Sequence, residues 1–361
     1  MAFDDLRELP DRFHEGVGRF LVLPRQPYAG EHGHRPDFVT GYPADLIALA
    51  TIMVAATRLS DGCHRYYFSH LSAKGDDVVS HFKPNKNNIA MLETSHVTIK
   101  EQECIISLEE GRLFAKTWTQ EGDAPDRIAP ILLFHDSLGC IDLWRSFPKH
   151  LAATTRRRVI AYDRLGFGRS DPYPGKLGSD FIRREAQHIV PQLCAQIGIA
   201  EFIACGHSVG GGMAVETAAY FQARCRALVT IAAQAFVEDR TLDGIRIAQG
   251  SFQDPANLAR LAKYHGDKAA WAVSAWIETW LSPEFAHWTL DAALAAVHCP
   301  VLAVHGEQDE YGTSEHPKRI AAGRGTAHIL PNTGHVPHRE REEFLIDTIQ
   351  QFLNGIEPLS R

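Results

Sequence analysis

The feature that most constrains the fold is a series of short apolar runs, separated by longer amphipathic segments, in the part of the chain that follows Met91. Alternation of this kind is typical of an α/β protein, in which helices cover both faces of a mostly parallel sheet. Such sheets place their ligand sites at the carboxyl ends of the strands. We expect strands at residues 130–134, 158–162, 202–205, 227–231, 301–305 and 327–330.

The alternation of short apolar runs stops between about residues 235 and 297, where a helical pattern replaces it. Four of the chain's six tryptophans lie in this stretch: Trp271, Trp276, Trp280 and Trp288. We interpret the stretch as a helical cap inserted into the α/β domain. A lid of this kind excludes water from a site and opens for substrate entry.

Residues 1–90 carry no motif with chemical content, and we interpret them as an N-terminal extension of unknown role that is poorly ordered in part. Their best helix candidate is residues 44–58, and residues 83–88 have the composition of a polar linker. Because the pattern becomes readable abruptly at Met91, a second hypothesis is that translation starts there. The α/β domain with its cap is expected at residues 91–361.

Charge and cysteine usage exclude several classes of protein. The chain of 361 residues has a formal net charge of −7, which disfavours a nucleic-acid partner bound through its phosphates. Its seven cysteines form no Cys-x-x-Cys pair, so neither a disulfide framework nor a zinc site is indicated, and we expect a cytoplasmic location. The longest apolar stretch, residues 46–56, is shorter than the roughly 20 residues needed to cross a bilayer. No membrane span, metal or cofactor is therefore expected.

The sharpest motif is Gly-His-Ser-Val-Gly at residues 206–210, which lies between an expected strand and a segment with a helical pattern. Gly-x-Ser-x-Gly in this context predicts a serine nucleophile on a very tight turn. The glycines are needed because side chains two residues before and after the serine would collide with the neighbouring strand and helix. We expect the turn to expose the Ser208 hydroxyl and to direct the amide of Val209 toward a developing oxyanion.

A serine hydroxyl is a weak nucleophile at neutral pH, so this interpretation requires a base and an acid that orients the base. Asp309 follows the expected strand at 301–305, and His335 follows the one at 327–330. We expect Asp309 to hold one nitrogen of His335 while the other nitrogen takes the proton of Ser208. The competing acids and the competing base are Glu307, Glu310 and His338.

A second amide for the oxyanion is expected on the loop that follows the strand at 130–134. The sequence there is His135-Asp136-Ser137-Leu138-Gly139, and a common arrangement is His-Gly followed by the donor residue. Ser137 is then the donor. The alternative is a plain surface turn.

Together these motifs resemble the α/β-hydrolase fold superfamily over residues 93–361. The resemblance also includes Asp163-Arg164-Leu165-Gly166-Phe167-Gly168-Arg169-Ser170, which matches a structural Asp-x-x-Gly-x-Gly-x-Ser turn of that family. One departure is Asp136, where the family usually has glycine. The resemblance implies a mostly parallel central sheet flanked by helices with an inserted helical cap. Within the superfamily the chain is similar to small capped esterases, lactonases and carbon–carbon bond hydrolases.

The residue at the tight turn limits the reaction. Relatives that displace halide or open epoxides use an aspartate there, whereas Ser208 implies an acyl-enzyme intermediate. We therefore expect a serine hydrolase that cleaves a carboxylic ester with a small or medium acyl group. The alternatives with the same three residues are a meta-cleavage carbon–carbon hydrolase and a lactonase, and a ligand receptor with slow turnover is the alternative outside enzymes. The oligomeric state is left open.

The substrate pocket is expected to be apolar. The cap tryptophans, as a group, indicate an apolar or aromatic-bearing acyl substrate, although any one of them is equally compatible with a place in the core. The residues that we expect to line this pocket are Leu138, Phe236, Trp271, Trp276 and Trp280.

Overall fold

The computed structural model describes residues 53–58, 64–69, 98–122 and 128–356. The chain divides into two compact units, one of residues 10–94 and one that contains residues 95–361.

In the first unit, β1 (Met53–Arg58) and β2 (His64–Ser69) form an antiparallel pair. The helix expected at residues 44–58 is therefore wrong for residues 53–58. The pairing of this segment with a strand rich in aromatic residues, His64–Ser69, outweighs its helical pattern. Residues 44–52 and the expected linker at 83–88 lie outside the described residues.

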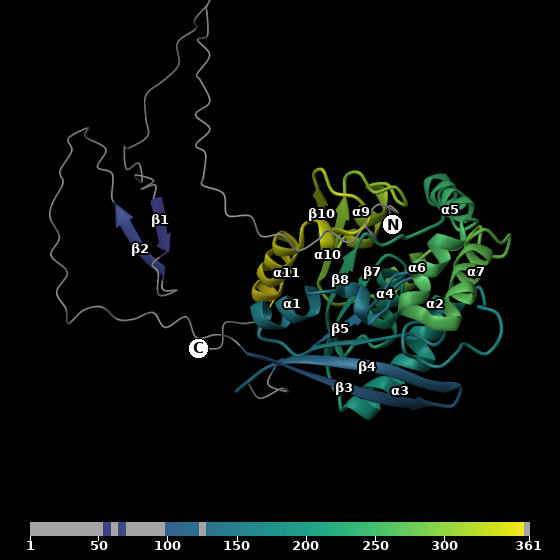
Figure 1. Cartoon of the computed structure of the whole chain (residues 1–361), viewed down its shortest axis with the longest axis horizontal. Helices are drawn as coiled ribbons and strands as arrows, with labels where there is room; N and C mark the ends of the chain where they lie inside the picture. The colour runs from purple at the N-terminus through teal and green to yellow at the C-terminus, as the bar shows by residue number, and fades with distance from the viewer. Residues whose placement is uncertain (1–52, 59–63, 70–97, 123–127, 357–361) are drawn as a thin grey trace, which may run out of the picture. The chain divides into compact units, whose positions relative to one another are not determined.

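The second unit is built on an eight-stranded sheet with the order β10-β9-β8-β7-β5-β6-β4-β3 (Figure 1). Along this order every neighbouring pair between β10 and β6 is parallel. The last two pairs, β6 with β4 and β4 with β3, are antiparallel. The strands are β3 (Ile99–Leu108), β4 (Gly111–Gln120), β5 (Ile131–Phe134), β6 (Val159–Tyr162), β7 (Phe202–His207), β8 (Cys225–Ile231), β9 (Val301–Gly306) and β10 (Gly325–Leu330).

All six strands expected from the apolar runs are present, whereas the β3–β4 hairpin has no counterpart among them. β3 contains Lys100-Glu101-Gln102-Glu103, and most of its residues are exposed. This solvated edge strand has no continuous apolar run, so the pattern that predicts buried strands is missing from it.

Helices cover both faces of the sheet because successive strand residues point to opposite sides. On β5, Ile131 and Leu133 belong to one hydrophobic cluster, while Leu132 and Phe134 belong to the other. The first cluster packs against α1 (Phe147–Thr155) and α11 (Glu342–Ile356). The helices on the other face include α2 (Phe181–Arg184), α3 (Val190–Ile197), α4 (Val209–Tyr220) and α9 (Glu315–Ala321), with a π-helical turn at Glu185–Ile189.

A helical insertion separates β8 from β9. Its helices α5, α6 and α7 are grouped on one side of the unit in Figure 1, where α7 packs against both α5 and α6. The helices of the insertion are α5 (Asp239–Ser251), α6 (Pro255–His265), α7 (Ala269–Trp280) and α8 (Asp291–Ala296).

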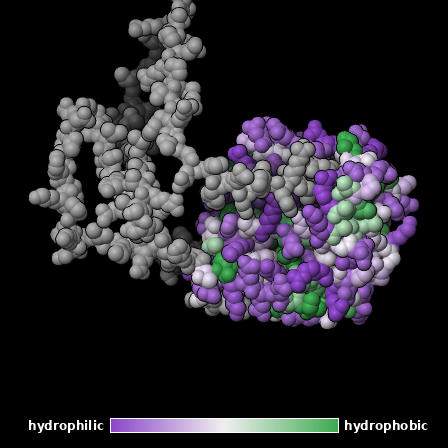
Figure 2. All heavy atoms as spheres, viewed as in Figure 1, coloured by the Kyte–Doolittle hydropathy of each residue, from purple (hydrophilic) through white to green (hydrophobic). Residues whose placement is uncertain are grey.

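The visible surface of the second unit is mostly hydrophilic, with hydrophobic residues in scattered patches (Figure 2). Among the described residues, no helix is both long enough and apolar enough to cross a membrane.

Candidate active site

Ser208 lies at the tight turn between the end of β7 and the start of α4. Its backbone angles are φ 55° and ψ −125°, a strained conformation for a residue with a side chain. Two backbone hydrogen bonds hold the turn: the Ser208 amide donates to the Ile231 carbonyl at 2.9 Å, and the Gly211 amide donates to the Ser208 carbonyl at 2.8 Å. The strain is therefore built into the connection between sheet and helix.

The glycines on either side of Ser208 leave no room for a side chain. A Cβ atom at Gly206 would overlap the carbonyl of Gly210, and one at Gly210 would overlap the carbonyl of Phe134 on β5. Both obstacles are backbone atoms, which cannot turn aside as the end of a flexible side chain can. The Gly-x-Ser-x-Gly spacing is thus a steric requirement of this turn.

Asp309, on the loop after β9, is completely buried and contacts His335. Both of its carboxylate oxygens lie 2.9 Å from His335 Nδ1. The amide of Tyr311 donates to Asp309 Oδ1 at 2.7 Å, and His305 Nε2 lies 3.3 Å from Oδ2. Burial raises the pKa of Asp309, while His305 and the Tyr311 amide oppose that rise. The carboxylate is held in one orientation by these contacts.

His335, on the loop after β10, is 6% exposed and lies between the rings of Tyr311 and His207. His207 Nε2 donates to the His335 carbonyl at 2.7 Å. Burial lowers the pKa of His335, which favours the neutral ring at pH 7. Because Nδ1 then carries the proton donated to Asp309, Nε2 is left as a proton acceptor.

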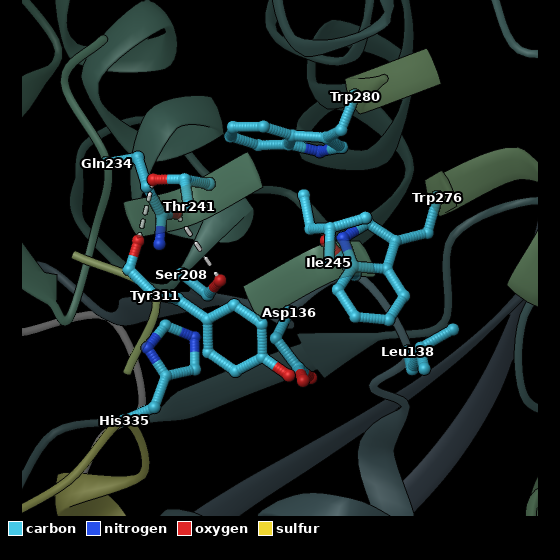
Figure 3. A pocket seen from close by; sticks show the side chains of 11 residues that line it. Asp136, Leu138, Ser208, Gln234, Thr241, Ile245, Trp276, Trp280, Tyr311 and His335 are labelled. Atoms are coloured by element: carbon cyan, nitrogen blue, oxygen red, sulfur yellow. Dashed lines mark hydrogen bonds between the residues drawn. The ribbon is translucent and has the colours of Figure 1, made fainter. Parts of the chain in front are cut away.

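Ser208 and His335 line the same cavity, where the space between the lining atoms, together with the opening to solvent, is about 400 Å³ (Figure 3). Ser208 Oγ donates to Gln234 Oε1 at 3.5 Å, so the hydroxyl has to turn toward His335 before it can transfer a proton. Hydrogen bonds between catalytic groups are often long or misaligned in the absence of substrate. The residues that line the cavity are Asp136, Ser137, Leu138, Ser208, Gln234, Thr241, Ile245, Trp276, Trp280, Tyr311 and His335.

The competing acids and base occupy other positions. Glu307 is exposed and accepts a hydrogen bond from the amide of Asn332 at 3.2 Å. Glu310 is exposed as well. His338 is buried, with its ring 4.7 Å from the rings of both Trp144 and His207. The geometry thus brings Asp309 and His335 together from the candidates on these two loops.

The loop after β5 places Ser137 on the cavity, and Val209 is the first residue of α4, directly after Ser208. His135 Nδ1 donates to the Asp136 carbonyl at 2.8 Å, and the amide of Arg164 donates to His135 Nε2 at 3.1 Å. Arg164 Nη2 also donates to the Asp136 carbonyl at 2.8 Å. These bonds fix the backbone of the loop beside Ser137.

Leu138, Trp276 and Trp280 line the cavity, but the expectation for Trp271 and Phe236 is corrected by the structure. Trp271 stacks on Tyr173 with ring centroids 5.4 Å apart, and its Nε1 donates to the Gly175 carbonyl. Trp276 and Trp280 are four residues apart and share one face of α7. Trp271 is five residues from Trp276, about 140° around the helix.

Phe236 lies outside the cavity because its backbone and its ring contact other residues. It forms an isolated antiparallel bridge with Thr289. Its ring lies 4.5 Å from the ring of His316, and the Arg319 guanidinium lies over it at 4.9 Å.

The residues of the cavity that the sequence analysis did not predict are Asp136, Gln234, Thr241, Ile245 and Tyr311. Two signals point to three of them. Gln234 follows the end of β8, where the strand-end rule that found Asp309 and His335 also applies. Thr241 and Ile245 are four residues apart on α5 and therefore share one helix face.

Comparisons with known proteins agree with this architecture. A family model described as "alpha/beta hydrolase fold" matches residues 129–259. The human protein "Serine hydrolase BPHL" is 29% identical over 199 residues, which are 52% of this chain and 66% of that protein. The chain thus matches just under two thirds of the length of this relative.

Two solved structures extend the likeness to the fold. A membrane phospholipase A, described as a bacterial virulence factor, has a TM-score of 0.58 at 22% identity and covers 71% of this chain and 86% of its own. Proline iminopeptidase of Mycobacterium smegmatis has a TM-score of 0.53 at 21% identity and covers 71% and 98%. The activities in these names differ, so the likeness fixes the fold and leaves the substrate open.

Proposed function

This chain belongs to the α/β-hydrolase fold superfamily, and on that premise we propose that it is a serine hydrolase that cleaves a carboxylic ester through an acyl-enzyme intermediate. The observation that carries the proposal is the shared cavity of Ser208 and His335, whose Nδ1 contacts buried Asp309. The human serine hydrolase with 29% identity supports it.

In the first half of the proposed reaction, Ser208 Oγ attacks the ester carbonyl carbon while His335 Nε2 accepts the hydroxyl proton. Asp309 keeps the Nδ1 proton of His335 in place and stabilises the imidazolium that forms. The amides of Val209 and Ser137 donate hydrogen bonds to the carbonyl oxygen as it becomes negative. His335 then gives its proton to the leaving alcohol, and the acyl group remains on Ser208.

In the second half, a water molecule takes the place of the alcohol. His335 accepts a proton from the water, which attacks the acyl carbon, and the same two amides stabilise the second oxyanion. His335 returns the proton to Ser208 Oγ as the carboxylic acid leaves. The strained turn holds Oγ at the cavity throughout, so no large movement of the sheet is required.

We assign a small or medium acyl group because the cavity is narrow. Apolar side chains of Leu138, Ile245, Trp276 and Trp280 supply most of the wall opposite Ser208 in Figure 3. We propose that the insertion at residues 239–296 acts as the cap that encloses this acyl group.

We further propose that the hydrolase domain spans residues 91–361 and that the enzyme works in the cytoplasm. The second proposal is supported by the free thiols of the described cysteines: Cys104, Cys140, Cys194, Cys205, Cys225 and Cys299.

The proposed function is tested by the hydrolysis of p-nitrophenyl esters with acyl chains of two to eight carbons. The wild type is expected to hydrolyse the shorter esters, and Ser208→Ala is expected to lower kcat/KM by roughly 10⁴-fold or more without changing the melting temperature. A vinylogous 1,5-diketone assayed in parallel reports carbon–carbon cleavage. Ester hydrolysis that survives in Ser208→Ala, or cleavage of the diketone alone, would contradict the proposal.

A further inference from the structure

Asp136 is the charged side chain of the cavity that the proposed reaction does not use. Among the described residues that line the cavity, it is the one acidic side chain, and the lining contains no lysine or arginine. It is half-buried and directly precedes Ser137, whose amide is proposed to bind the oxyanion. A carboxylate therefore lies beside the point at which negative charge develops.

The position of this carboxylate is built into the loop. A Cβ atom at residue 139 would overlap Asp136 Oδ1, so the carboxylate occupies space that Gly139 leaves free. The backbone carbonyl of Asp136 is fixed by hydrogen bonds from His135 and Arg164. Figure 3 shows the side chain on the same side of the cavity as the phenol of Tyr311.

The buried cation that interacts with Asp136 is shared with a second carboxyl. Arg164 interacts with both Asp136 and the buried carboxyl of Glu185, and Glu185 accepts a hydrogen bond from the Tyr162 hydroxyl at 2.7 Å. During the reaction the imidazolium of His335 is balanced by Asp309. The oxyanion and Asp136 are then two negative charges at the cavity, and none of the described residues that line it is a lysine or an arginine.

A fixed negative charge next to an oxyanion raises the energy of the transition state. The barrier is lowered when the substrate itself supplies a positive charge. Resting on the proposed function, we propose that Asp136 is a specificity-determining residue that binds an ammonium group of the substrate. The substrate class is an ester with a cationic amine a few bonds from its carbonyl carbon.

The walls of the cavity suit a cation of this kind. Tyr311, Trp276 and Trp280 line it, and the rings of Tyr311 and Trp276 lie 6.1 Å apart. Aromatic faces attract ammonium groups through the electrostatics of the ring, most strongly where water is excluded. A carboxylate in a cavity that three aromatic side chains also line combines a charge partner with an apolar wall.

The test uses pairs of esters that differ only in charge. In the acyl pair, the p-nitrophenyl ester of trimethylglycine is compared with that of 3,3-dimethylbutyric acid. In the alcohol pair, acetylcholine is compared with 3,3-dimethylbutyl acetate. In each pair a quaternary nitrogen replaces a quaternary carbon, so shape is conserved. Each kcat/KM is divided by the rate of spontaneous hydrolysis, which removes the intrinsic reactivity of the charged ester.

The key variant is Asp136→Asn, and the matched control is Asp142→Asn, which removes an exposed carboxylate six residues further along the chain, in the 3-10 turn Ile141–Trp144. We expect the wild type to prefer the cationic member of at least one pair. Asp136→Asn should lower that preference by about tenfold or more, through slower hydrolysis of the cationic ester and faster hydrolysis of the neutral one. Asp142→Asn should keep the wild-type preference.

The outcomes separate this inference from the proposed function. Equal effects of Asp136→Asn on both members of each pair, with hydrolysis that still requires Ser208, overturn the role of Asp136 and leave the serine hydrolase standing. If no ester of these pairs turns over, phosphonylation of Ser208 by a methylphosphonate carrying choline is compared with that by its 3,3-dimethylbutyl analogue. Faster reaction of the choline compound, lost in Asp136→Asn, supports the inference, whereas equal rates overturn it.

Discussion

Two regions of the molecule meet at one cavity and are built in different ways. The loops at the carboxyl edge of the sheet supply Ser208, His335 and Ser137, whereas the insertion supplies Trp276 and Trp280. Backbone sterics and buried hydrogen bonds hold the sheet-edge residues, as at Ser208 and Asp309. Ring packing holds the insertion, as in the Trp280, Phe285 and Trp288 cluster with centroids 5.0–5.7 Å apart.

In this comparison the reaction and the substrate selectivity depend on different physical constraints. Close backbone contacts leave the sheet edge few alternatives, so a change there is expected to stop the reaction. Packed aromatic side chains tolerate replacement more readily, so a change in the insertion is expected to alter which substrate is used.

The largest effect is expected from His335→Ala. The variant removes the proposed base and acid, so kcat/KM for a short p-nitrophenyl ester should fall by roughly 10⁴-fold or more. Asp309→Asn should also lower it strongly, by about 10²-fold to 10⁴-fold, because the amide disfavours the required tautomer of His335. Steady-state kinetics and a melting curve check both variants. A loss of less than tenfold in folded His335→Ala would remove this residue from the mechanism.

The second effect compares two glycines of the same segment. In Gly210→Ala the new Cβ overlaps backbone atoms of β5, so we expect activity to fall by about 100-fold or more and stability by a few kcal/mol. In Gly212→Ala the nearest atoms are side-chain carbons at 3.5–3.7 Å, an ordinary contact, so activity and stability should stay near wild type. Urea denaturation and ester kinetics distinguish the two. Equal behaviour of the variants would contradict the steric account of the turn.

The third effect belongs to the insertion. Trp276→Ala enlarges the cavity wall, so we expect kcat/KM for short acyl esters to fall by about tenfold while longer acyl chains gain relative to shorter ones. Trp271→Ala is the control, because Trp271 packs on Tyr173 outside the cavity. Its chain-length profile should match wild type. If Trp276→Ala leaves the ratio of kcat/KM for long and short acyl esters unchanged, the insertion does not determine the selectivity.

The smallest effect concerns pH. Burial lowers the pKa of seven histidines, five of them in or beside the sheet-edge loops, so the folded state resists protonation below pH 6.5 while the unfolded state accepts it. The contribution of these histidines to the free energy of unfolding is therefore fully present above pH 6.5. It is lost as the pH falls toward their pKa values in the folded state, which is about 4 for His207. The seven are His135, His207, His265, His305, His316, His335 and His338.

Burial also raises the pKa of four carboxyls, Asp163, Glu185, Glu216 and Asp309, which act in the opposite direction. Because the histidines are more numerous, the melting temperature is expected to fall, by roughly 10 °C between pH 7.5 and pH 5. Differential scanning calorimetry at the two pH values measures the change. A protein that melts at the same or a higher temperature at pH 5 would contradict the expected excess of the histidine contributions over those of the carboxyls.

The same contrast explains how far the sequence could be interpreted. Ser208, Asp309 and His335 were predicted because each follows an apolar strand, and parallel strands bring their carboxyl ends to one edge without reference to the rest of the fold. The place of Trp271 was not predictable, because it depends on how α7 is rotated against its neighbours. Hydrophobicity alone gives the same prediction for Trp271, which packs against the core, and for Trp276, which lines the cavity.

The other differences have related causes. β3 was not predicted because an exposed edge strand with several charged residues lacks the apolar run that is typical of a buried strand. Residues 53–58 have a helical pattern and yet form a strand, because pairing with residues 64–69 is a contact that no local pattern reveals.

The central claim is that Ser208 is the nucleophile of a serine hydrolase, and labelling with a fluorophosphonate probe tests it most directly. The probe reacts with activated serines, and peptide mapping by mass spectrometry identifies the modified residue. We predict one adduct, on the peptide that contains Ser208, formed much more slowly in His335→Ala. Folded wild-type protein that gains no adduct, or gains it on a different serine, would contradict the claim.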